Sequence, residues 1–584
     1  MKKIFITMLV YFTTAFIFAT TKNITDDKKN VEKKSQNIQV VAHSVINFTE
    51  LAKKAAETKT KDITNIKTQV IPIGEYHEQQ IPPEDLEKIK SGKQFDKAVP
   101  EKKFSISNEP ISSTSSPSSS NDEIAPSAPP VPLGPVDTQD SFQAMPLDSA
   151  GGYLQTPPDT MGVAGLNYLM TTLNSHVRIQ NKSGTTVSTV TLNDFWASVN
   201  GGGGGTAGTF DPKIVYDQEE DRFIFVALDD RDANSGILLG ITETDDPTGN
   251  WFLWKIDADA TDTDWADFPS PGFNTNWIAL SMNMFQIGGG GIFTGAKIWM
   301  IDKKRAYTND LNVIDTISPG SGFTIAPCIT FGNQTNIFTI STGWNSGSDD
   351  YLRIGSINGS VSSPVWSQVG FLDIPDSDSP VDAPQLGGSD LIDNGDSRIS
   401  SPPINRFGHI FYCFSGNLSS PSRNVILWSE FNAYSGATTH AGIVEESTIP
   451  MYYAYPSIAV NCNTSIVLGF SGFSTGIYGS AYYTGREFTN APNVMQEVKL
   501  LKAGEDYYNL DFGGGNRWGD YSATCVDPAD DLKFWTIQEY AMPEFDATYD
   551  RWGTWWGHVY FVPEPVSIYY LPFIIYYLLR LLHR

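Results

Sequence analysis

The sequence predicts an all-β protein, a seven-bladed β-propeller, and three observations support this fold class. Anchor positions at which strands are expected to begin recur every 54 to 72 residues. Near-continuous apolar runs such as Phe223–Leu228 and Trp277–Leu280 follow them, as in strands buried on both faces. The chain is also rich in Gly, Tyr, Phe and Trp, and its C-terminal two thirds show no sustained helical period. The anchors are Pro158, Pro212, Pro269, Pro327, Pro384, Pro456 and Tyr521.

Each repeat places a short segment and an apolar run on either side of a polar turn, the pattern expected of neighbouring strands in a propeller blade. Units of about 60 residues leave room for several strands and long loops. The Pro158 and Pro384 copies are the least complete. Six or eight blades, a β-sandwich and a parallel β-helix remain as alternatives. The clear copies are Asp211–Leu228, Asp267–Phe285, Ala326–Thr342, Tyr455–Phe473 and Asp520–Tyr540.

The first 140 residues differ in composition from the rest. Residues 1–21 place two lysines before an apolar run, which predicts a secretory signal. Residues 22–140 are first rich in Lys, Glu and Asp and then in Ser and Pro, which predicts a disordered linker or pro-region. Within it, Asn47–Thr58 is expected to form a short helix. The propeller is expected to span residues 141–561.

The net charge of −26 excludes nucleic acid as a partner, because the chain has no basic stripe to meet phosphates. It suits a soluble extracellular protein that meets cations or neutral or basic ligands. The cysteines lie far apart without a CxxC or a nearby His pattern, which argues against zinc. One or two disulfides and free buried thiols are both open. The cysteines are Cys328, Cys413, Cys462 and Cys525.

Acidic residues recur where the repeats begin. Innermost propeller strands all start on one face close to the axis, so these side chains are expected to converge. Converging carboxylates suit Ca²⁺ or a polyhydroxylated ligand. The alternative is that each Asp caps the backbone of its own turn. The acids are Asp159, Asp211, Asp267, Asp382 and Asp520.

A second metal-site hypothesis concerns Asp230, Asp232 and Asn234, whose alternate spacing is that of an oxygen-rich Ca²⁺ loop. The acidic run Asp257–Asp264 is similar. Neither has a full EF-hand pattern, because Gly236 comes one place late and no Glu fills the twelfth position. A solvated acidic loop is the alternative.

Arg517, Asp520 and Tyr521 lie within one predicted turn near the axis. A carboxylate or Tyr base beside a charge-neutralising Arg is chemistry that glycan cleavage uses. With Arg398, and with Trp518 as a stacking platform, they predict a pocket for an acidic sugar. The alternative is that Arg517 pairs with Asp520 while Trp518 packs between blades. The catalytic candidates are Asp520, Tyr521, Arg517, Asp211 and Asp267, and the ligand-binding candidates are Trp518, Arg398, Asp382 and Asp159.

A family resemblance rests on motifs such as DPKIVYDQEEDRFIFVAL (Asp211–Leu228), LIDNGDSRI (Leu391–Ile399) and WGTWWGHV (Trp552–Val559). They resemble a group of uncharacterised secreted bacterial β-propellers with a distantly sialidase-like architecture. The resemblance covers roughly Pro157–Phe561 and implies fold and export, but no settled activity. The Asp-box of sialidases has no good match, because the nearest segment, Thr244–Trp251, has the wrong Asp-to-Gly spacing.

The C-terminus resembles a PEP-CTERM sorting signal, in which Pro-Glu-Pro, an apolar segment and a basic end follow one another. The apolar segment Val566–Leu579 has 14 residues, fewer than the ~20 that usually cross a bilayer. The resemblance implies processing by an exosortase-type enzyme in a Gram-negative bacterium; an ordinary membrane anchor is the alternative. The predicted signal spans residues 562–584, with Pro563, Glu564, Pro565, Arg580 and Arg584 as its key residues.

Taken together, these patterns predict an exported propeller, displayed on or released from the cell surface, that binds extracellular polysaccharide or another matrix component. A polysaccharide-degrading glycosidase or lyase acting at the axial face is the first alternative. A purely structural surface protein is the second.

Overall fold

The computed structural model describes residues 39–58, 67–70, 133–147, 153–200, 208–320, 322–345, 349–446, 450–511, 515–545 and 549–563. All belong to one compact unit, Asn37–Arg584. The predicted signal peptide (residues 1–21) and residues 564–584 of the predicted sorting signal lie outside the described residues. Within the described residues, no helix is long and apolar enough to cross a membrane.

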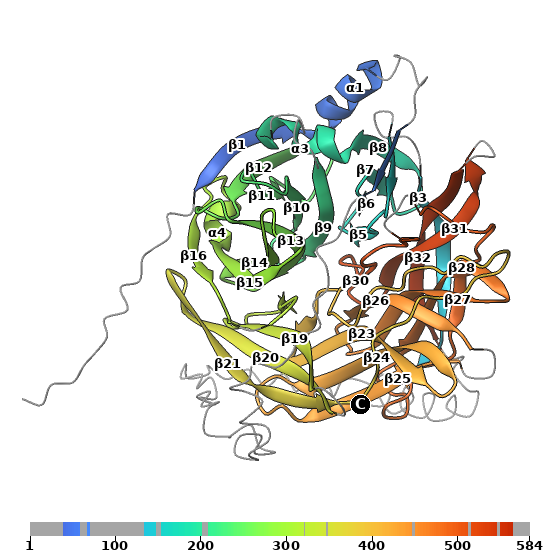
Figure 1. The fold of residues 1–584 in the computed structure, drawn as a ribbon. Helices are drawn as coiled ribbons and strands as arrows, with labels where there is room; N and C mark the ends of the chain where they lie inside the picture. The colour runs from blue at the N-terminus through green and yellow to red at the C-terminus, as the bar shows by residue number, and fades with distance from the viewer. Residues whose placement is uncertain are drawn as a thin grey trace, which may run out of the picture. The chain divides into compact units, whose positions relative to one another are not determined.

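The fold is an all-β propeller, and five of its blades are separate antiparallel sheets of four or five strands (Figure 1). Within each blade, most strands follow one another in chain order, as expected for a propeller. One sheet contains β5 (Met161–Ala164), β6 (Tyr168–Thr172), β7 (His176–Asn181) and β8 (Thr186–Thr191). The next contains β9 (Thr209–Asp217), β10 (Arg222–Asp229), β11 (Gly236–Thr242), β12 (Asn250–Asp257) and, at its outer edge, β1 (Val40–Asn47).

The other three separate blades have four strands each. The first comprises β17 (Ala326–Pro327), β19 (Ile337–Asn345), β20 (Asp349–Ser360) and β21 (Ser363–Ile374). The second comprises β26 (Tyr452–Val460), β27 (Ile466–Ser474), β28 (Ile477–Arg486) and β29 (Lys499–Lys502). The third comprises β30 (Ala523–Val526), β31 (Phe534–Phe545), β32 (Tyr549–Pro563) and β3 (Leu133–Pro146).

A nine-stranded sheet corrects the prediction of a seven-bladed propeller, because it leaves five blades rather than seven. It joins two antiparallel meanders through the short strand β18, which pairs in parallel with the innermost strand of each. Five blades therefore stand as separate sheets, because hydrogen bonds across β18 merge the remaining strands. The first meander contains β13 (Asp264–Phe273), β14 (Trp277–Gln286), β15 (Phe293–Asp302) and β16 (Val313–Ile317). The second contains β22 (Ile404–Arg406), β23 (His409–Ser419), β24 (Ser422–Asn432) and β25 (Thr438–Val444), and β18 is Ile329–Thr330.

The innermost strands form a closed ring. Strand β5 contacts β9, β9 contacts β13, and β13 contacts both β17 and β18. Strand β18 pairs with β22, β22 contacts β26, β26 contacts β30, and β30 returns to β5. The last sheet is completed by β3 from the start of the domain, which pairs antiparallel with β32. The propeller thus begins at Leu133 rather than at the predicted residue 141.

Part of the segment predicted as a disordered linker is ordered. The helix expected at Asn47–Thr58 is confirmed as α1 (Phe48–Thr58). Strand β1 pairs with β12, and Phe48 is fully buried against Phe195 of α3 (Leu192–Asn200). A short strand β2 (Lys67–Val70) pairs with β4 (Tyr153–Thr156). The one remaining helix among the described residues is α4 (Lys303–Ala306).

The recurring prolines mark β-bulges. In β9, β13 and β26, the pairs Asp211-Pro212, Phe268-Pro269 and Tyr455-Pro456 each lie opposite a single residue of the next strand. The residue before each proline has a φ of +51° to +54°. Proline fits here because a bulge needs one backbone donor fewer than a regular ladder.

One predicted anchor is wrong. Pro384 lies in the segment of residues 375–403 between β21 and β22, which contains only isolated β-bridges and which we name the strap. The strap crosses to other sheets, since Asp393 pairs with Arg517 just before β30. It adds length without a strand, which accounts for the long interval after Pro384. All four cysteines are free, and Cys328 and Cys413 are buried.

Ring closure by β3 can be tested by truncation. A chain that begins at Leu147 lacks β3, and we expect it to lose cooperative melting. The reason is that β32 keeps β31 but loses β3, its other partner strand, and with it the hydrogen bonds between Met145 and Thr554, of 3.0 and 2.9 Å. Calorimetry and tryptophan fluorescence during heating measure this.

The matched control begins at residue 59, which removes β1 and α1 but keeps β3. It should melt cooperatively at a temperature lowered by several degrees, since it loses only an outer strand and the buried Phe48. Equal melting of the two truncated chains would contradict ring closure by β3.

Candidate functional site

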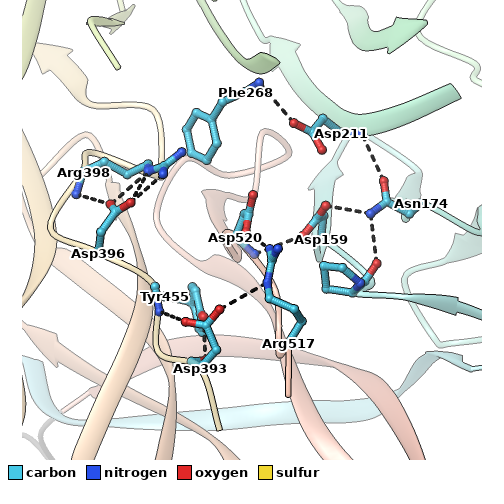
Figure 2. A network of polar contacts seen from close by, with 12 residues as sticks. Asp159, Asn174, Asp211, Phe268, Asp393, Asp396, Arg398, Tyr455, Arg517 and Asp520 are labelled. Atoms are coloured by element: carbon cyan, nitrogen blue, oxygen red, sulfur yellow. Dashed lines mark hydrogen bonds and ion pairs between the residues drawn. The ribbon is translucent and has the colours of Figure 1, made fainter. Parts of the chain in front are cut away.

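Three carboxylates meet at one end of the ring. Asp159, Asp211 and Asp520 each offer an oxygen that lies within 4.8 Å of the other two (Figure 2). Asp159 precedes β5, Asp211 lies in β9 and Asp520 precedes β30, so three neighbouring innermost strands contribute one acid each. We name this group the axial acid cluster. It is the only such group of potential metal ligands among the residues that the structure describes.

Hydrogen bonds tie the cluster to neighbouring sheets. Asn174 Nδ2 donates to Asp159 Oδ2 at 2.6 Å, and Asn174 Oδ1 accepts the N–H of Asp211 at 2.9 Å. Asp211 Oδ2 accepts the N–H of Phe268 at 3.1 Å, and Asp159 Oδ1 accepts the N–H of Asp520 at 3.0 Å. Each of these two carboxylates therefore caps the backbone of another sheet rather than that of its own turn.

Arg517 connects the cluster to the strap. Its Nη2 donates to Asp520 Oδ1, and its Nε lies 3.3 Å from Asp393 Oδ2. Tyr455 holds the strap in place by donating its hydroxyl to the carbonyl of Asp393 at 2.7 Å. Arg517 is buried, and its guanidinium is paired with these two acids. The ion pair between Arg517 and Asp520 agrees with the alternative interpretation of this turn.

Arg398 also makes its ion pair within the strap. Its Nε lies 2.9 Å from Asp396 Oδ1, and its Nη2 lies 2.5 Å from Asp396 Oδ2. The guanidinium stacks over the rings of Phe268 and Phe323 at 4.5 and 4.9 Å. Figure 2 shows this pair facing Phe268, beside the axial acid cluster. The strap therefore brings its own charged pair to this end of the ring.

Lys213 is buried near the cluster. Its Nζ donates to the carbonyl of Ser400 at 2.8 Å and lies about 4 Å from the ring centres of Phe268 and Tyr521. Burial lowers the pKa of Lys213 to about 7, although the charge of Asp211 opposes this shift. The Tyr521 hydroxyl donates to a backbone carbonyl, and burial raises its pKa well above the usual value. Tyr521 therefore stays neutral at physiological pH.

Burial and mutual repulsion shift the acids. Burial raises the pKa of Asp159 to about 7, the charge of Asp520 adds to the shift, and Arg517 opposes it. Burial, followed by the charge of Asp267, raises the pKa of Asp211 well above its usual value. The buried Glu539 has a pKa raised by its burial and then by the charge of Asp159. Such a cluster retains protons at neutral pH or needs a positive ligand.

Three further residues predicted for the site, Asp267, Asp382 and Trp518, do not belong to the axial acid cluster. Asp267 is buried near Asp211, whereas Asp382 is exposed on the strap. The expected stacking platform is wrong, because Trp518 is fully buried, donates to Ser471 Oγ at 3.0 Å and packs edge-on against Phe473. Its burial leaves no ring face for a sugar.

In the loop of Asp230, Asp232 and Asn234, the last two residues bond to each other, whereas the buried Asp230 Oδ1 has no hydrogen-bond partner. The backbone N–H and side-chain Nδ2 of Asn234 donate to Asp232 Oδ1 at 2.8 and 3.0 Å. In the acidic run that follows, Asp259 Oδ2 accepts hydrogen bonds from Thr261, Thr263 and the N–H of Asp264. Both loops show the turn chemistry of the alternative interpretation.

Four residues of the site were not predicted from the sequence: Asn174, Lys213, Asp393 and Glu539. Lys213 has a local signal, since it follows Pro212 directly and interrupts an apolar strand. Asp393 lies in the motif LIDNGDSRI. Asn174 and Glu539 have no local signal, because their roles depend on which distant segments pack together.

An apolar cavity of about 60 Å³ lies among the innermost strands. Its lining includes Ile214 of β9, Ile404 of β22, Ile458 of β26 and Cys525 of β30. Because one cavity is lined from opposite parts of the ring, it lies on the axis. Its walls offer little for a polar ligand, so the chemistry of this axis is concentrated in the acid cluster.

No family model and no curated protein matches this chain. Distant structural similarity links it to sialidase and arabinanase propellers. Trypanosoma rangeli sialidase in complex with sialic acid has 9% identity and a TM-score of 0.33, covering 67% of this chain and 57% of the sialidase. An exo-1,5-alpha-L-arabinanase from a bovine ruminal metagenomic library has 11% identity and a TM-score of 0.28, covering 48% and 96%.

A protein of unknown function from Dyadobacter fermentans has 10% identity and a TM-score of 0.28, covering 51% of this chain and 95% of that protein. The present chain spans less than two thirds of the sialidase chain.

The pH dependence of stability tests the surroundings of Asp159. A folded pKa of about 7 against 3.8 means that the folded state binds more protons than the unfolded state between these values. The contribution of Asp159 to stability therefore falls as pH rises from 4 to 7. The free energy of unfolding of Asp159→Asn, taken relative to that of the wild type, should therefore increase by about 2–4 kcal/mol between pH 4.5 and pH 8.

Urea unfolding at several pH values in metal-free buffer measures this difference. The effect of the substitution on stability at any single pH does not enter the test, because the test compares how the free energy of unfolding changes with pH. Parallel profiles for the wild type and the variant would show that Asp159 is ionised normally in the folded protein.

Proposed function

We propose that this propeller binds extracellular polysaccharide at the axial end covered by the strap. The observation that carries the proposal is the concentration of fixed polar groups there. Beneath the strap lie the axial acid cluster and Arg517, and on its exposed side Asp390 accepts the hydroxyl of Tyr507 at 2.7 Å and Nδ2 of Asn509 at 2.8 Å. An aromatic ring with fixed carboxylate and amide groups is a combination suited to sugar hydroxyls.

Exposure decides which of these groups a glycan can meet first. Asp390 and Asn509 are exposed, and the side chain of Asp393 is 31% exposed. Asp159 and Asp211 are almost fully buried. A glycan would therefore contact the strap and Tyr507, with the buried acids fixing the strap through Arg517.

Hydrolysis is the second candidate function, and one observation favours it. Asp159 has a pKa of about 7 and lies within 4.8 Å of two further carboxylates. A glycosidase needs one carboxyl group that is protonated near neutral pH and a second that is ionised. Hydrolysis would require the strap to move away from Asp159. The remaining alternative is a purely structural role on the cell surface, which would require no ligand.

Export is part of the proposal. Residues 1–21 and the sequence from Pro563 to Arg584 support passage through the membrane of a Gram-negative bacterium and processing by an exosortase-type enzyme. Pulse labelling of the full chain in such a host, with Glu564→Ala as the variant, tests the sorting signal. Equal processing of the variant and the wild type would count against it.

A polysaccharide panel tests the binding proposal. The full chain is incubated with bacterial and algal polysaccharides, retention is measured, and soluble products are followed by mass spectrometry. We expect retention on at least one polysaccharide without new oligosaccharides. Tyr507→Ala should weaken retention about tenfold or more, because the ring and its bond to Asp390 are lost.

Asp232→Asn is the control, since it removes one half-buried acid that does not belong to the strap. It should bind like the wild type. New oligosaccharides that disappear in Asp159→Asn would establish the hydrolase instead. Absence of both retention and products across the panel would leave the structural role.

A further inference from the structure

We infer that Asp159, Asp211 and Asp520 form a binding site for one hard divalent cation of the Ca²⁺ type. Ca²⁺ holds oxygen ligands at about 2.3–2.6 Å, so two ligands of one ion lie no more than about 5 Å apart. The three carboxylate oxygens lie within 4.8 Å of one another. One ion between them can reach all three without a large shift of the backbone.

Glu539 gives a second, independent indication of a positive ligand. Its residue is only 3% exposed, and its Oε1 has no hydrogen-bond partner. A Cβ placed on Gly519 would lie 3.5 Å from Glu539 Oε2 and 3.9 Å from Asp159 Oδ1, so both carboxylates face this glycine. The Thr160 hydroxyl is a neutral neighbour that lowers the pKa of Glu539. A proton or a cation would stabilise the buried carboxylate further, because its Oε1 has no donor.

The protein's own cations do not neutralise the two most buried acids. Among the described residues, neither Asp159 nor Asp211 has an ion pair within 4.0 Å, and both accept hydrogen bonds from the neutral N–H groups described above. Lys213 donates to a carbonyl, and Arg231 stacks over the rings of Phe210 and Trp265 at 4.4 and 5.3 Å. The negative charge of the cluster is thus only partly compensated.

The donor set selects the class of ion. All potential ligands are carboxylate oxygens, whereas zinc sites are built mainly from His and Cys. Mg²⁺ demands near-ideal octahedral geometry at about 2.0–2.1 Å, and Ca²⁺ accepts irregular sets. Asp159 and Asp520 precede their strands, whereas Asp211 lies within β9, so the three carboxylates form such an irregular set.

The position of the ion would matter for the ring. Asp520 belongs to the last sheet, Asp159 to the sheet of β5, and Asp211 to the sheet of β9. A bound ion would therefore link the sheets on both sides of the point where the chain closes on itself. It should raise the stability of the whole propeller and not only that of a loop.

The experiment uses the full chain after treatment with a chelator. Calorimetric titration with CaCl₂ should show one ion per chain, and a hundredfold excess over the Kd should raise the Tm by several degrees. Asp211→Asn should weaken binding at least tenfold. Its amide oxygen still accepts the N–H of Phe268, so the fold is retained.

Asp232→Asn is the matched control, because it removes one carboxylate from the alternative loop. It should bind Ca²⁺ like the wild type. If Asp211→Asn does not fold, Asp159→Asn takes its place. No heat and no change in Tm, or wild-type binding by the cluster variants, would overturn the inference, and loss of binding in Asp232→Asn would move the site to the loop. No polysaccharide is present, so the outcome is independent of the proposed function.

Discussion

The fold depends on hydrogen bonds by which one sheet caps the start of the innermost strand of the next. Asp211 and Phe268 take a left-handed conformation at bulges, and Thr324 takes one just before β17, so the N–H of each lies outside the ladder of its own sheet. A side-chain oxygen of the neighbouring sheet accepts each of these N–H groups. The left-handed conformation is therefore stabilised only when the correct sheet packs beside it. The bonds run from Asp211 to Asn174, from Phe268 to Asp211 and from Thr324 to Asn283.

This way of joining sheets has an electrostatic cost, because it brings buried carboxylates together on the axis. Asp159 and Asp211 cap backbone groups and also repel each other, and burial raises both pKa values. The strap adds to the burial by placing Arg398 and Asp393 at the same end. The same residues thus join neighbouring sheets and form the axial acid cluster.

The repeat is visible in the sequence because prolines near the starts of strands mark β-bulges. Pro212, Pro269 and Pro456 lie in equivalent bulges of β9, β13 and β26. Pro384 misleads, because proline is as common in a strap as at a bulge. Acids at strand starts predict the gathering of Asp159, Asp211 and Asp520, since propeller geometry converts position in the repeat into position near the axis. Local pattern could not show that β18 merges two meanders or that Trp518 is buried, because both depend on contacts between distant segments.

Strand β3 and its partner β32 also set the order of events during synthesis. Met145 and Thr554 are separated by 409 residues, so the last sheet is incomplete until almost the whole domain has been made. At about 5–20 residues per second, the first strand waits about 20–80 s for its partner. During that time β3 is an unpaired strand whose backbone donors and acceptors are open to pairing with another chain, a hazard that ends when the last sheet forms.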